Sequence, residues 1–272
     1  MDDANANITV LDAFTSALEW WDEMGVDVPK TIAARPKARQ QNTAREKSAT
    51  SAQTSRSSKA RSPQAAANTA SFDTRLAAAK KMAASAKDVG ALKTAMAGFD
   101  AGTLSDNATQ CVFARGNPES RLMVIGEAPT HEEDASGRPF DGRSGQLLDR
   151  MLAAIGLTTD EFYASAIINW RPPGSRAATP EEIALCRPFL ERHIELAAPD
   201  FLLITGGVAL AAMTDLTGIM KNRGAWQTLK FGDRDIPALP IYHPAFLLKR
   251  PELKKEAWRD LLSLHARLNI DS

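Results

Sequence analysis

Carboxylates, a histidine and turn-forming residues gather in residues 126–152, which read GEAPTHEEDASGRPFDGRSGQLLDRML. The stretch follows an apolar run, RLMVI, and ends in a segment whose apolar residues have helical spacing. Glu127, Glu133 and Asp141 supply carboxylates, which can act as general bases toward water. Glycines and prolines at this density fix a compact loop whose backbone can approach a ligand closely. The pattern indicates a binding or catalytic site between a strand and a helix.

Within this loop Phe140 is an apolar residue among polar neighbours. It either packs the loop onto the core or offers a stacking platform for a flat ligand. A second candidate segment, HPAFLLKRP, begins at His243, just after the last apolar strand and before a proline that favours an extended backbone. Its apolar residues 246–248 either form a buried turn or form a wedge that enters a base stack, with Lys249 and Arg250 placed for phosphates.

A third candidate segment, NWRPPGSR, places Arg171 and Arg176 on either side of a rigid Pro-Pro-Gly turn. Guanidinium groups in this position suit phosphate contacts or a structural ion pair. A glycine pair, Gly206 and Gly207, follows another apolar run.

These segments must be positioned by regular elements, and the apolar pattern predicts them. Strands are expected at RLMVI, EFYASAII and DFLLITG, with a hairpin at residues 226–244 that leads into a last strand. Helices are expected at residues 73–86, 88–99, 144–155, 179–196, 208–216 and 253–268. Strands separated by helices predict an α/β fold with a mainly parallel sheet covered on both faces. In such sheets ligands bind beyond the carboxyl ends of the strands, where the polar segments fall.

Composition sets the outer limits of the function. The 272 residues include 33 basic and 33 acidic side chains, so the net charge does not by itself indicate a nucleic-acid partner. Cys111 and Cys186 are too few for a disulfide framework or a four-thiolate metal site. No apolar run reaches membrane-spanning length, and the N-terminus lacks the basic region of a signal peptide. We therefore expect a cytoplasmic protein, monomeric and without a membrane partner.

The chain is expected to have three parts. Residues 1–29 have helical spacing of apolar side chains and predict a short helix that docks on the body or on a protein partner. Residues 30–71 carry nine basic residues against one acid, Glu46, and few large apolar side chains, which predicts disorder. This segment is either a solvated linker or a basic tether that raises the local concentration of DNA or RNA. The folded body is expected at residues 72–272.

Taken together and in this order, the motifs resemble those of the uracil-DNA glycosylase superfamily, most closely its family 4. The matching pieces are GEAP…EED…GRPFDG.SGQLLDRML..IGL, RPPGSR..TPEEI..C.PFL, P..LLITGG.A, RGAW and YHPAFLLKRP, which cover roughly residues 99–258. The resemblance implies a three-layer α/β/α fold. It also implies a monofunctional enzyme that flips a deaminated base out of single- or double-stranded DNA and hydrolyses its N-glycosidic bond.

The resemblance further implies a role for each matching residue. Phe140 would be the platform for the base, Glu127 and Glu133 would position the sugar and the attacking water, and His243 would donate a hydrogen bond to the base oxygen. The remaining implied DNA contacts come from Gly206, Gly207, Leu247, Lys249 and Arg250, in addition to Arg171 and Arg176.

One departure from the family concerns a cofactor. Family 4 proteins typically carry an iron–sulfur cluster on four cysteines, and the corresponding positions here are Phe99, Gly102, Trp170 and Cys186. A single thiolate cannot hold such a cluster. The sequence therefore predicts no iron–sulfur cluster, no metal ligands, and aromatic side chains filling that volume.

The other departures concern the base pocket. Ala166 stands where the family has an asparagine that reads the uracil edge, so Asn169, Asp141 or backbone groups would have to read it instead. Thr130 and Asp141 differ from the usual GEAPG and PFVG motifs. Asp141 could be a water-activating base or a reader of a base N–H, or both changes could be drift in an inactive site. Two hypotheses follow: a DNA glycosylase, or a glycosylase-like DNA-binding protein with weak or no excision.

Overall fold

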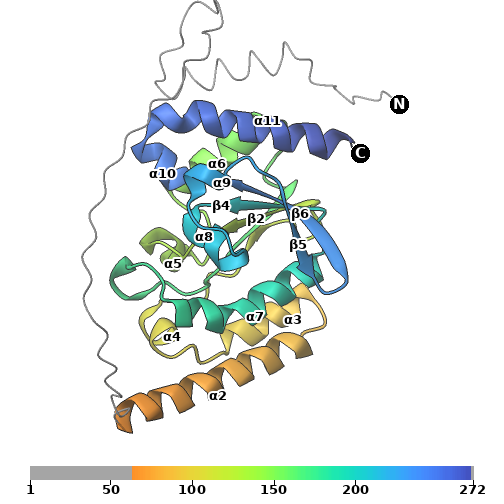
Figure 1. Cartoon of the computed structure of the whole chain (residues 1–272). Coiled ribbons are helices and arrows are strands. Elements are labelled where there is room, and N and C mark those ends of the chain that lie inside the picture. Colours follow the sequence, from red (N-terminus) through yellow and green to blue (C-terminus); the bar gives the residue numbers. More distant parts are fainter. Residues whose placement is uncertain (1–62, 271–272) are drawn as a thin grey trace, which may run out of the picture.

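The computed structural model describes residues 63–270 (Figure 1). The predicted N-terminal helix and most of the predicted basic linker lie outside the described residues. Helix α2 (Pro63–Ser85) begins inside the segment expected to be disordered, so the expected boundary at residue 72 falls within a helix. Its first turns are rich in alanine and start on a proline, and both features favour a helix even where no large apolar side chain is present.

The predicted mainly parallel sheet is confirmed. Six strands take the order β1-β3-β2-β4-β6-β5. Their bounds are β1 Arg115–Gly116, β2 Leu122–Gly126, β3 Phe162–Ala166, β4 Phe201–Thr205, β5 Gln227–Phe231 and β6 Arg234–Ile241. The inner strands β3, β2, β4 and β6 are parallel, while β1 and β5 are antiparallel edges. Every residue of β2, β3 and β4 is buried, as expected of strands covered on both faces.

Helices cover both faces of the sheet and give three layers (Figure 1). On one face α2 and α3 (Val89–Ala97) pack against α7 (Pro180–Ala197). On the other face α6 (Arg143–Ala153) packs against α10 (Pro244–Lys249) and α11 (Lys254–Ile270). The shorter helical elements are α4 Thr103–Asn107, α5 His131–Ser136, α8 Gly207–Met213, α9 Ile219–Asn222 and the 3-10 turns Pro173–Ser175 and Pro251–Leu253. The two apolar cores lie on the two sides of the sheet.

Local signals explain the start of α7. Thr179 caps the helix through its side chain, Glu182 returns a hydrogen bond to the Thr179 backbone, and Pro180 occupies the first turn. The helix expected at residues 179–196 is confirmed. Two segments expected to be loops instead contain the short helices α5 and α10.

The chain topology creates a crevice at the carboxyl edge of the sheet. From β2 the chain crosses to β3 on one side, whereas from β4 it crosses to β6 on the other side. The loops after the neighbouring strands β2 and β4 therefore diverge, which is the usual ligand position in open α/β sheets. Gly126 and Ala166, the last residues of β2 and β3, are paired at this edge.

Candidate active site

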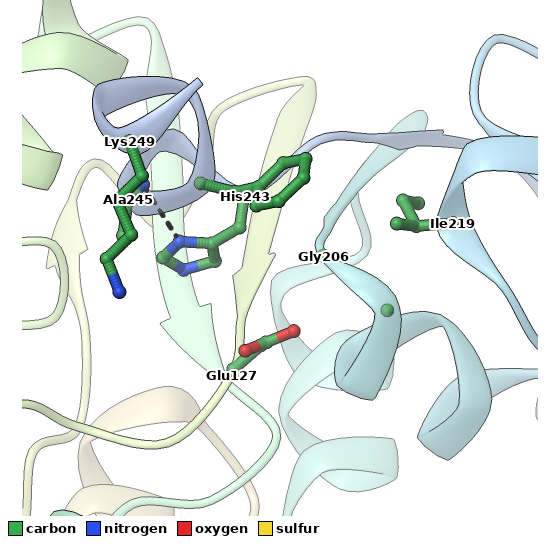
Figure 2. Close-up of a pocket in the computed structure, with 8 residues that line it drawn as sticks. Glu127, Gly206, Ile219, His243, Ala245 and Lys249 are labelled. Atoms are coloured by element: carbon green, nitrogen blue, oxygen red, sulfur yellow. Dashed lines mark hydrogen bonds between the residues drawn. The ribbon is translucent and has the colours of Figure 1, made fainter.

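A cleft of about 300 Å³ opens at this carboxyl edge (Figure 2). It is lined by Glu127, Gly206, Gly207, Ile219, His243, Ala245, Phe246 and Lys249. A narrower slot adjoins it, and Glu127 and His243 line both. Phe140, Ala166, Thr130 and Glu133 also line the slot. The structure thus brings together residues from four separate segments of the sequence.

The orientation of His243 is fixed by the start of α10. As the N-cap of this helix, it accepts a hydrogen bond at Nδ1 from the backbone N–H of Ala245, at 3.1 Å (Figure 2). Burial lowers the pKa of His243 to about 4, so the ring is neutral near pH 7. Since Nδ1 accepts, the single proton of the neutral ring is on Nε2. His243 therefore offers an N–H donor without bringing a positive charge.

Glu127 is held at the junction of the β2 and β4 loops. Its Oε1 accepts a hydrogen bond of 3.0 Å from the backbone N–H of Val208, in the first turn of α8. Gly206, at φ 95°, has no side chain that would overlap this carboxylate. Burial raises the pKa of Glu127 above its usual value. The other oxygen, Oε2, accepts no hydrogen bond from any residue within 63–270.

Phe140 packs on the core and also lines the slot. The residue is only 4 % exposed, and its ring is stacked with the His243 ring at 5.9 Å and 20°. A Cβ at Gly126 would lie 2.7 Å from the ring, so the glycine at the end of β2 makes room for it. The two interpretations of Phe140, core packing and platform, are therefore compatible.

The profile of the Uracil DNA glycosylase superfamily matches residues 113–262, which is more than half of the chain. The chain belongs to this superfamily. Its relatives include proteins named Type-4 uracil-DNA glycosylase. The protein from Archaeoglobus fulgidus is 34% identical over 158 residues, which is 56% of this chain and 79% of the relative. That from Thermotoga maritima is 35% identical over 162 residues, with 57% and 81% covered. The expected family resemblance is confirmed.

Two residues expected to replace the missing asparagine of the superfamily do not face the slot. Asn169 is buried, and its amide donates to the carbonyls of Val112 and Phe113, at 2.9 and 3.5 Å. Asp141 is exposed, outside the cleft and the slot, and accepts a hydrogen bond from the Gly142 N–H. The structure therefore does not place Asn169 or Asp141 beside the slot, and the roles predicted for them, reading the base and activating water, stay predictions. Ala166 presents only a methyl group to the slot.

Three of the seven residues predicted to contact DNA are engaged within the protein. Leu247 is fully buried against the core because α10 turns it inward, so in this structure it does not project as a wedge. Arg171 donates to the buried Asp134 at 3.2 Å, and Arg176 forms a two-pronged ion pair with Glu182. Both arginines thus take the structural interpretation that the sequence left open.

Two cations at the end of α10 remain at the surface. Lys249 is exposed and lines the cleft, and the phosphate contact expected of it stays a prediction. Arg250 is exposed but pairs with Glu252 at 2.6 Å. Ile219 of α9 lies on the opposite side of the cleft and adds an apolar surface (Figure 2), and Gly206 and Gly207 also line the cleft.

The positions of the family 4 cysteines do not fit a cluster. Phe99 and Trp170 lie with ring centroids 6.1 Å apart, and Phe99 also meets Phe189 edge-on at 5.0 Å. Cys186 is buried in the same apolar core, and Gly102 has no ligand atom in its side chain. Within residues 63–270 no three His, Cys, Asp or Glu side chains form a metal site. One thiolate surrounded by packed rings cannot bind a four-iron cluster.

Sequence reasoning missed several positioning groups. The backbone N–H groups of Ala245 and Val208 fix His243 and Glu127, and no side-chain pattern could show this. Thr130 and Glu133, by contrast, form a capping box at the start of α5. The Thr-x-x-Glu signature was present in the sequence and could have predicted it.

Proposed function

We propose that this protein is a monofunctional DNA glycosylase that hydrolyses the N-glycosidic bond of uracil or another deaminated base in DNA. The observation that carries the proposal is the convergence of Glu127, Phe140 and His243 at the switch point of the sheet. The relatives named Type-4 uracil-DNA glycosylase support the same reaction class.

The site suggests how the bond would break. A flipped base would lie against Phe140, with a carbonyl oxygen toward the Nε2–H of His243. Negative charge grows on this base as the bond to the sugar breaks, and a neutral donor aimed at it stabilises the transition state. The Glu127 carboxylate would stabilise the positive sugar carbon and orient water toward it. Water then supplies the hydroxyl of an abasic site, and the base leaves with the remaining proton. No lysine nucleophile is required.

One observation favours a second function, DNA binding without efficient excision: Ala166 presents a methyl group where a base edge would be read. A protein with this pocket could bind DNA without excising bases efficiently. Oligonucleotides bearing uracil, hypoxanthine or xanthine, in single and double strands, separate the two functions. Alkali-sensitive cleavage on one of them supports the glycosylase, whereas tight binding with no abasic product on any of them supports the alternative.

The Ala166→Asn variant is expected to excise uracil about 10–100-fold faster, because an amide reading the base edge adds one or two buried hydrogen bonds. The measurement is the single-turnover rate on a uracil oligonucleotide. Ala166→Leu is the control, since it fills the slot without a polar group and should not raise the rate. A fall in the asparagine variant would show that the pocket reads its base in another way.

We also propose that the protein works without an iron–sulfur cluster. Protein purified without oxygen should contain far less than one iron atom per chain and show no broad visible absorbance band. A family 4 protein that carries the four cysteines, purified in parallel, is the control for cluster loss during handling. Stoichiometric iron in this protein would contradict the proposal.

DNA is thus the proposed partner, approached from the face that carries Lys249. Within residues 63–270 no helix is long and apolar enough to cross a membrane. A cytoplasmic location, a monomeric state and a protein partner for the N-terminal helix stay predictions of the sequence.

A further inference from the structure

Two carboxylates border the base slot, and their surroundings differ. No residue within 63–270 donates a hydrogen bond to Oε2 of Glu127. Glu133 is 7 % exposed, and both of its oxygens are engaged. Oε2 accepts from the backbone N–H of Thr130 at 2.6 Å, and Oε1 accepts from the backbone N–H of Phe140. The two donors belong to the two ends of the loop that surrounds the slot.

These contacts tie Phe140 to the first turn of α5. Thr130 caps this turn through Oγ1, which accepts from the Glu133 N–H at 3.4 Å. Phe140 is held at φ 54°, a left-handed conformation that phenylalanine rarely adopts. A backbone in such a conformation persists only when its surroundings determine it. The hydrogen bond that the Phe140 N–H donates to Oε1 of Glu133 is one such determinant.

Close packing supplies the other determinants. The Phe140 ring lies over Gly126, and the Phe140 carbonyl occupies space that a side chain at Gly145 would need. The ring therefore packs over Gly126 with His243 beside it, while the Phe140 backbone packs against Gly145. Because of these contacts, the ring reaches its position over Gly126 only when the Phe140 backbone has its left-handed conformation.

We propose that Glu133 is a positioning residue that holds the platform Phe140 in place, and that it does not itself activate water. The proposal rests on the proposed function for its effect on catalysis. A carboxylate whose two oxygens both accept backbone N–H bonds is poorly placed to take a proton from water. Its ionised form is instead the acceptor that two inward-pointing N–H groups require.

The first test is a graded series. Glu133→Gln keeps one amide oxygen as acceptor, and Glu133→Ala keeps none. We expect single-turnover uracil excision to fall by about tenfold in the first and about 100-fold in the second, as one and then two charge-assisted bonds are lost. Equal and near-complete loss in both variants would indicate a catalytic carboxylate and overturn the proposal.

A double-mutant cycle with Phe140→Ala tests whether the rate loss in Glu133→Gln depends on the Phe140 ring. If Glu133 acts through the ring, Glu133→Gln should cost almost nothing further once the ring is absent. If the rate losses of the two single variants multiply in the double variant, the proposal is overturned. Thermal melting of each variant separates this coupling from general destabilisation, which would not depend on Phe140.

Hydrogen exchange tests the same contact without relying on activity. The amides of Thr130 and Phe140 should both be protected in the wild type; one of them should lose protection in Glu133→Gln, and both should lose it in Glu133→Ala. Glu132→Gln removes the same charge from the preceding, exposed residue and should leave both amides protected. Persistent protection of both amides in Glu133→Ala would overturn the proposal. If no base is excised by the wild type, the proposed function fails while this measurement still decides the contact.

Discussion

Replacing His243 with alanine is expected to slow base excision by about 10²–10³-fold, the usual effect of removing one donor to a developing negative charge. The reason is the fixed Nε2–H, whose direction is set by the bond from the Ala245 N–H to Nδ1. The measurement is the single-turnover rate on a uracil oligonucleotide, together with the dissociation constant for undamaged duplex, which should change little.

His243→Gln is the matched control, because its amide keeps an N–H donor on a side chain of similar length. We expect this variant to lie between the wild type and His243→Ala. The pKa of about 4 means that His243 is already neutral throughout the range above pH 5, so its contribution should not change there. A rate in His243→Ala equal to that of the wild type would remove this residue from the mechanism.

The sequence predicted the elements and the edge at which they meet, for physical reasons that the structure makes plain. Mainly apolar runs became β2, β3 and β4, and all five residues of each strand are buried because the sheet is covered on both faces. Parallel strands bring their carboxyl ends to one edge. Polar residues that follow different strands, such as Glu127 and His243, were therefore predicted to meet before any distance was known.

Side-chain direction within the loops could not be predicted in the same way. Residues 243–251 looked irregular, but α10 turns Leu247 inward and leaves Lys249 at the cleft. Asn169 lies beyond the end of β3, where the alternation of a strand no longer decides which way a residue points. Arg171 forms an ion pair with Asp134, which lies 37 residues earlier in the chain, and no local sequence pattern indicates such a partner.

The strongest remaining prediction concerns Glu127. Glu127→Gln should lower the single-turnover rate by about 10²–10⁴-fold, the range for loss of a positioned general base. The amide oxygen can still accept from the Val208 N–H, so the fold of the cleft should be kept and the loss should be chemical. Unchanged melting temperature and unchanged binding of undamaged DNA are the controls.

The pH dependence gives this prediction a second measurement. Burial raises the pKa of Glu127, and only its ionised form can stabilise a cationic sugar or accept a proton. The wild-type rate should therefore fall as the pH drops through this raised value, and the residual rate of Glu127→Gln should lack that decrease. If Glu127→Gln kept the wild-type rate while Asp141→Asn lost it, Asp141 would have to move from its exposed position into the site, and water activation would belong to a conformation other than the one described here.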